Sequence, residues 1–224
     1  TLTQENKQVV FVRRPSGRPT PEVFEMRSET LRALEPNEYL VRNHVIAMDP
    51  ALVSRMRNES NYAEPVAVGE VMHAYTVGEV IESNCPAIPV GQMRVARFGM
   101  QEYTIASESL GGFPVDTERA PASWYLGVLG TTGATAWLSF KEICDPKPGE
   151  TVLISSAGSS VGTVVAQLAL RAKCSVVGIV STPEKAAQVQ STWGFKQVLS
   201  YRDKSIDELS KELAQACPDG VDVY

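Results

Sequence analysis

The sequence has 224 residues, of which 43% are hydrophobic and 21% are charged, and its formal net charge is -5. This composition is typical of a globular protein. The 21 Lys and Arg residues are scattered along the chain, whereas a surface for nucleic acid or an anionic membrane needs a concentrated basic face. We therefore expect neither a nucleic-acid nor a membrane partner.

The cysteines, the histidines and the N-terminal stretch indicate whether the protein binds a metal and in which compartment it lies. The chain has two histidines and four cysteines, and no two cysteines are close enough in sequence to form a zinc knuckle or a disulfide framework. The N-terminal stretch is polar and lacks the basic and apolar regions of a signal peptide. These features predict a metal-free, reduced, cytoplasmic protein.

The first part of the chain, residues 1–122, contains short segments in which apolar and polar residues alternate. Residues 38–47, 70–83 and 101–107 fit strands with a period of two, and residues 90–98 fit a turn leading into another strand. Gly, Pro and Asn separate these segments. Such spacing predicts a small, barrel-like β domain.

Residues 123–224 have a different pattern, which begins with a helix-like segment over 123–143. Strands are predicted over 151–155, 175–180 and 196–200 and beginning at 221, alternating with helices over 160–173, 181–193 and 204–217. This alternation predicts right-handed crossovers and a doubly wound parallel sheet, hence an α/β protein of two domains. Dinucleotide-binding sheets usually have about six strands, so we expect this one to be truncated at its fourth.

The turn after the first of these strands is rich in small residues. It comprises Ser156, Ala157, Gly158, Ser159, Ser160, Val161 and Gly162. Small residues allow backbone N–H groups at a helix N-terminus to approach a pyrophosphate, whose negative charge the helix dipole favours. The pattern is not a strict glycine fingerprint, so a tight turn without a ligand remains an alternative.

The end of the predicted strand over 175–180 bears on the choice between NAD and NADP. An NAD site usually has an acidic residue there, whereas an NADP site needs a cation for the 2′-phosphate. Ser181 follows this strand and Lys185 comes soon after, although Glu184 keeps NAD open. Three residues after the third strand could close around the same phosphate: Tyr201, Arg202 and Lys204. The residues thus favour NADPH.

Several motifs together resemble a known family. They are MDPALVSRM (48–56), GEVMHAYTVGEVIES (69–83), MQEY (100–103), LGVLGTTGATAW (126–137), PKPGETVLISSAGSSVG (146–162), EKAAQV (184–189), WGF (193–195) and CPDGVDVY (217–224). In this order they resemble the zinc-independent medium-chain dehydrogenase/reductases, in particular the NADPH-dependent double-bond reductases. That branch includes prostaglandin reductases, plant alkenal reductases and bacterial curcumin reductases.

The resemblance implies a GroES-like catalytic domain over 1–122 and the first part of a Rossmann domain over 123–224. It further implies a homodimer in the complete protein and metal-free transfer of hydride from NADPH to the β-carbon of an unsaturated ketone or aldehyde. Lys185 and Tyr201 match the family's 2′-phosphate contacts, and the turn over 156–162 matches its pyrophosphate contacts. The family's segment beside the nicotinamide corresponds to Gly130, Thr131 and Thr135.

Reduction of an enone requires a group that stabilises the developing enolate oxygen, and a tyrosine hydroxyl can do this. Tyr75 matches a tyrosine of the plant branch and is our candidate, the alternative being that it only packs on the sheet. On the substrate side the resemblance places Tyr62 and Ala51, the latter where the family has tyrosine. Met100 replaces a family tryptophan. These changes predict a reshaped or more open substrate pocket.

Two other functions remain open at this point. A quinone oxidoreductase of the same fold would have little need of Tyr75. A non-catalytic NADPH-binding protein would fit the loss of tyrosine at Ala51.

Overall fold

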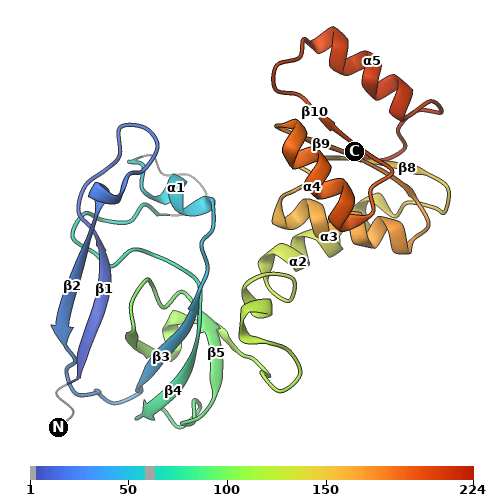
Figure 1. The fold of residues 1–224 in the computed structure, drawn as a ribbon. Coiled ribbons are helices and arrows are strands. Elements are labelled where there is room, and N and C mark those ends of the chain that lie inside the picture. The colour runs from blue at the N-terminus through green and yellow to red at the C-terminus, as the bar shows by residue number, and fades with distance from the viewer. Residues whose placement is uncertain (1–3, 59–63) are drawn as a thin grey trace. The chain divides into compact units, whose positions relative to one another are not determined.

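The computed structural model describes residues 4–58 and 64–224. It divides into two compact units, Thr1–Leu126 and Gly127–Tyr224, called unit 1 and unit 2 below (Figure 1). The predicted domain boundary lay at residue 122. Within the described ranges, the helices are all too short or too polar to cross a membrane.

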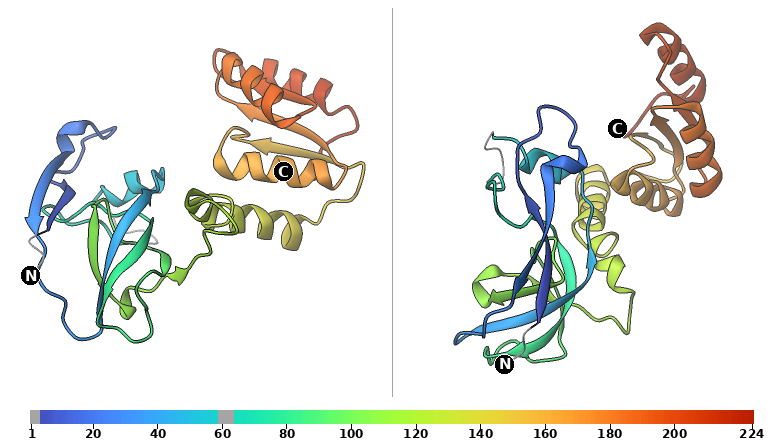
Figure 2. Two further views of the ribbon diagram at one scale, coloured as in Figure 1. Left: turned by 60° about the horizontal axis from the view of Figure 1, so that its bottom comes forward. Right: turned by 60° about the vertical axis from the view of Figure 1, so that its left-hand side comes forward.

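Unit 1 is built mainly from antiparallel strands. Its elements are β1 (Glu5–Phe11), η1 (Pro21–Val23), β2 (Phe24–Thr30), β3 (Glu38–Ile46), α1 (Ala51–Arg55), β4 (Thr76–Ser83), β5 (Met93–Ala96), β6 (Tyr103–Ser107), η2 (Glu108–Leu110), β7 (Phe113–Pro114) and η3 (Ala122–Leu126). β1 pairs with β2, and a separate five-stranded sheet has the order β6-β3-β4-β5-β7 (Figures 1 and 2). Isolated bridges between Gln8 and Gln101 and between Val10 and Val71 link β1 to other segments of the unit.

The predicted strand over 70–83 is wrong in its first part, because β4 begins only at Thr76. The alternation there is real, since Met72 and Ala74 are buried in the core. However, the backbone of this segment changes partners: Met72 donates its N–H to Val9, and its carbonyl accepts from Met100. Residues 70–75 therefore bridge two neighbours instead of extending β4. The pair β1–β2 was not predicted at all.

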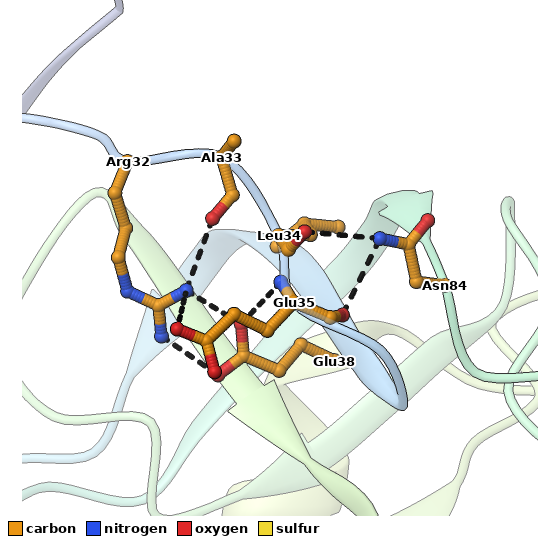
Figure 3. A network of polar contacts seen from close by, with 6 residues as sticks. All are labelled: Arg32, Ala33, Leu34, Glu35, Glu38 and Asn84. Carbon is orange, nitrogen blue, oxygen red and sulfur yellow. Dashed lines mark hydrogen bonds and ion pairs between the residues drawn. The ribbon is translucent and has the colours of Figure 1, made fainter.

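The segment before β3 is held by a polar network (Figure 3). Both terminal nitrogens of Arg32 donate to the Glu38 carboxylate, at 2.6 and 2.7 Å, and the Glu35 N–H donates to it at 2.8 Å. Asn84 donates to the carbonyls of Leu34 and Glu35. The Arg32 and Glu35 hydrogen bonds stabilise the charged carboxylate and lower the pKa of Glu38 to about 2.

Unit 2 contains a parallel sheet with helices on both faces. Its elements are α2 (Thr131–Leu138), η4 (Ser139–Cys144), β8 (Thr151–Ser155), α3 (Ser160–Arg171), β9 (Ser175–Val180), α4 (Pro183–Trp193), β10 (Gln197–Ser200) and α5 (Ile206–Ala216). The strand order is β10-β9-β8. The predicted fourth strand is present only as a parallel bridge between Val152 and Val223, on the side of β8 opposite β9.

Alternate residues of each strand in unit 2 enter opposite cores, as a strand buried on both faces requires. Val152, Val176 and Val198 pack with buried residues of α3 and α4. Leu153, Val177 and Leu199 pack with α5, whose Leu209 and Leu213 contact the same cluster.

The predicted helix-like segment over 123–143 is divided into three pieces. η3 ends at Leu126, a turn follows, and α2 then continues directly into the π-helical η4. Gly133 explains the tight turn, because a Cβ at this position would lie 1.7 Å from the carbonyl oxygen of Val128. The glycine allows the backbone of the turn to lie against α2, where any side chain would clash.

Candidate functional site

The turn between β8 and α3 has the geometry of a capped helix start. Ser159 is the N-cap, and its Oγ accepts the N–H of Gly162 at 3.1 Å. Ser156 has a left-handed backbone, with φ of 49°. A Cβ on Gly162 would lie 2.7 Å from the Ser156 carbonyl oxygen, so only glycine allows this close packing of turn on helix. The first N–H groups of α3 have no partners within the helix.

A cavity of about 230 Å³ lies beside this turn. Its lining consists of Ser156, Gly158, Ser159, Val180, Ser181, Lys185 and Tyr201. Two backbone hydrogen bonds hold the chain after β10 against the end of β9. Tyr201 donates its N–H to the Val180 carbonyl at 3.1 Å, and Arg202 donates to that of Ser181 at 3.0 Å. The structure thus brings together predicted site residues that lie up to 45 positions apart (Ser156 to Tyr201).

The charge in this cavity is positive. Lys185 is the charged residue of its lining, and its own N–H donates to Thr182, the N-cap of α4. The Glu184 carboxylate is not part of the lining; hydrogen bonds from its own N–H and the Thr182 hydroxyl lower its pKa. Lys204, also suggested as a phosphate contact, is not part of the lining, and its Nζ donates to Glu212 at 2.6 Å.

The remaining predicted cofactor residues lie outside the cavity lining. Ala157 is fully buried, while Ser160 and Val161 form the first turn of α3. Gly130 is the N-cap of α2, and the Thr135 hydroxyl donates to the Thr131 carbonyl at 2.8 Å.

The predicted substrate-side residues lie in unit 1. Tyr75 is 46% exposed, and the Arg97 guanidinium lies over its ring, 5.8 Å from the centroid. Ala51 begins α1 and donates its N–H to Asp49 Oδ1 at 2.8 Å. Met100 is buried in the core of unit 1 with Leu52 and Met56, so it fills core volume there. Tyr62 lies outside the described residues.

Arg97 was not predicted as a site residue. It lies in a short sequence, VARF, without a recognisable motif, and only its contact with Tyr75 in the structure draws attention to it. No arrangement of three or more His, Cys, Asp or Glu side chains suited to a metal ion occurs in the described part of the chain.

Comparisons with known proteins agree with this architecture. Residues 7–111 match the N-terminal domain of oxidoreductase. The chain is 35% identical to the 2-alkenal reductase (NADP(+)-dependent) of Nicotiana tabacum, over 98% of this chain and 64% of the relative. It is also 35% identical to the NADPH-dependent curcumin reductase of Escherichia coli, over 99% of this chain and 63% of the relative. Over nearly its whole length the chain is therefore similar to the double-bond reductase branch of the medium-chain dehydrogenase/reductases.

A solved structure of this branch has the same fold. CurA from Vibrio vulnificus in complex with NADPH matches with a TM-score of 0.85 at 32% identity, over 96% of this chain and 63% of that chain. The present chain spans a little under two thirds of the length of these double-bond reductases.

Proposed function

We propose that this protein binds NADPH and reduces the carbon–carbon double bond of α,β-unsaturated ketones or aldehydes. The observation that carries the proposal is the cavity at the ends of β9 and β10, where Lys185 and Tyr201 meet the glycine- and serine-rich turn. A cation at this position suits a 2′-phosphate, whereas a ribose 2′-hydroxyl would call for an acid. The names of the relatives supply the reaction class.

The residues around the cavity fit this cofactor. Lys185 and Tyr201 would hold the 2′-phosphate, and the turn over 156–162 would receive the pyrophosphate, with Ser181 beside the ribose. Gly162 lets the turn pack directly against the start of α3, which shapes the backbone that would receive the pyrophosphate. Gly130, Thr131 and Thr135 would lie beside the nicotinamide. When bound, NADPH supplies the hydride for the β-carbon.

The protein's own contribution to the chemistry is electrostatic. We assign to Tyr75 the donation of a hydrogen bond from its hydroxyl to the oxygen that becomes negative as the β-carbon is reduced, before the α-carbon is protonated. The exposure of Tyr75 supports this role, because a substrate can reach its hydroxyl, and Arg97 holds the ring by lying over it. Ala51 and Tyr62 belong to the substrate side in this proposal.

The same proposal covers the domains. The five-stranded sheet of unit 1 supports a GroES-like substrate domain over 1–122, and the sheet order of unit 2 supports a Rossmann domain over 123–224. By analogy with the family, we also propose that the protein is a homodimer and is located in the cytoplasm.

The cofactor assignment can be tested without turnover. Calorimetry should show that 2′,5′-ADP binds at least tenfold more tightly than 5′-AMP, because the extra phosphate gains a charge-assisted contact with Lys185. Lys185→Gln should remove most of this difference. Lys211→Gln, an exposed lysine of α5, is the matched control and should keep it. Equal binding of the two nucleotides by the unmodified protein would contradict the NADPH assignment.

Turnover tests the reaction class. The protein is mixed with NADPH or NADH and a simple enone, and the nicotinamide absorbance is followed. Oxidation much faster with NADPH than with NADH supports the proposal. Oxidation only with quinones would favour a quinone oxidoreductase, and NADPH binding without any turnover would favour a non-catalytic NADPH-binding protein.

A further inference from the structure

A second cavity lies in unit 1, close to Tyr75. It has a volume of about 470 Å³ and is lined in part by His73, Arg97 and Gln101. The segments that carry these residues run side by side, since Met100 donates its N–H to the Met72 carbonyl at 2.9 Å and Gly99 donates to that of Ala74 at 3.1 Å.

In the extended segment over 72–75, successive side chains lie on opposite sides of the chain, one side facing the core. Met72 and Ala74 are buried in the core beneath α1, which leaves His73 and Tyr75 on the opposite side of the extended chain. Arg97 links the cavity to Tyr75, because it lines the cavity with His73 and stacks on the ring of Tyr75. A molecule that reached the Tyr75 hydroxyl would therefore have a cationic cavity wall nearby.

The polar groups around this cavity carry unused hydrogen-bonding capacity. His73 Nδ1 is buried without a hydrogen-bond partner, and so is one terminal nitrogen of Arg55, at the end of α1. Among the described residues, neither Arg55 nor Arg97 forms an ion pair. A buried polar atom without a partner is costly and calls for an explanation, such as a ligand.

The charges around His73 favour an anion. Burial and the positive charges of Arg55 and Arg97 lower the pKa of His73, so that its imidazole is neutral near pH 7 and offers one N–H. Two carboxylates are close. Glu70 accepts the N–H of Ala67, and its negative charge partly offsets the effect of the two arginines on the pKa of His73. Glu38 lies in the cavity lining, where Arg32 binds its carboxylate.

We propose that His73 and Arg97 form an anion subsite that binds a carboxylate carried by the substrate, at the end remote from its reacting carbonyl. The inference rests on the proposed function, in that Tyr75 contacts the carbonyl end of the same molecule. The favoured substrates are enones with a carboxylate tail. A guanidinium suits this group because it donates two parallel hydrogen bonds to a carboxylate.

The test uses two enones that differ by one group: 4-phenylbut-3-en-2-one and the same compound with a para-carboxylate on its ring. We expect kcat/KM to be about tenfold higher for the carboxylate, as charge-assisted hydrogen bonds of this kind allow. Arg97→Gln should abolish that ratio, and Arg97→Lys should restore part of it. Arg18→Gln, an exposed arginine of the β1–β2 connection, should leave the ratio unchanged.

A binding measurement separates failure of the subsite from failure of the proposed function. In calorimetry, 4-acetylbenzoate should bind more tightly than acetophenone, and Arg97→Gln or His73→Gln should weaken only the former. Reduction of both enones at equal kcat/KM, with no preference for the benzoate, would overturn the subsite and leave the reductase standing. If neither enone were reduced, the proposed function would fail, and the benzoate preference would still decide the subsite.

Discussion

The two units build their candidate sites in different ways. In unit 2 the cavity is built on one turn of consecutive residues, Ser156 to Gly162, held by a helix cap and a tight backbone contact. Lys185 and Tyr201 complete its lining from later segments. In unit 1 the polar groups around Tyr75 come from segments that are distant in sequence, such as His73 and Arg97. The comparison shows that a backbone turn depends on local spacing, whereas the meeting of side chains from separate segments depends on strand pairing.

The largest expected effect tests how far unit 2 depends on backbone packing. Gly133→Ala places a Cβ 1.7 Å from the Val128 carbonyl oxygen, an atom that cannot move aside as a flexible side chain would. We expect a loss of about 3 kcal/mol or more in the free energy of unfolding, measured with urea. Gly17→Ala in unit 1 is the control, because no atom lies within 4 Å of its added Cβ. Equal stability of the two variants would refute this account of the turn.

The next effect concerns the side-chain site of unit 1. Tyr75→Phe removes the hydroxyl but keeps the ring beneath Arg97, so the stacking contact should persist. Enone reduction should slow by about 100-fold, the usual cost of losing one donor to a developing oxyanion. Quinone reduction by the same variant serves as the comparison and should change much less. Unchanged rates with both substrates would show that Tyr75 does not act on the carbonyl.

A smaller effect distinguishes capping from ligand binding in unit 2. Ser159→Ala should destabilise the protein by about 1 kcal/mol, the typical value of an N-cap, because its Oγ accepts the Gly162 N–H. Ser205→Ala removes the cap of α5, which also forms a capping box, and should cost a similar amount. Only Ser159→Ala should also weaken binding of 2′,5′-ADP, because only Ser159 lines the cavity. Equal nucleotide binding by both variants would limit Ser159 to a structural role.

The smallest effect is a pH dependence in unit 1. The pKa of Glu38 is about 2 in the folded protein, below its ordinary value of 4.5, because Arg32 and the Glu35 N–H bind the carboxylate. A lowered pKa stabilises the fold above pH 4.5, and this contribution is lost as the pH falls towards 2. Arg32→Gln should therefore reduce stability near neutral pH, with the difference shrinking below pH 4.5. Urea unfolding across this range checks it, and a constant difference would contradict the assignment.

The elements of unit 2 could be predicted well because their signals are local. β8 and β9 lie at the predicted positions, and α4, predicted over 181–193, is capped by Thr182 and Gly194. A continuous apolar run identifies a strand buried on both faces, and a capping residue acts within one helical turn. The cavity residues of this unit were named for the same reason, since most lie in or next to such turns.

Unit 1 was harder to predict. β1 and β2 were missed, and the segment over 70–75 was assigned to β4, although its backbone pairs with β1 and with residues 99–100. An antiparallel strand has the same alternation whichever neighbour it pairs with, so the sequence does not specify the partner. Arg97 was missed as a consequence, because only this pairing places it on Tyr75.

The sequence by itself therefore determined the two-part α/β organisation, the small-residue turn at 156–162 and the cation at Lys185, because each depends on spacing within one or two turns of chain. The tertiary structure decided which charges are free to act. It bound Lys204 to Glu212 and Glu38 to Arg32, and it placed Arg97 over Tyr75. Such pairings join residues whose spatial proximity is set by packing and strand register, which no short stretch of sequence encodes.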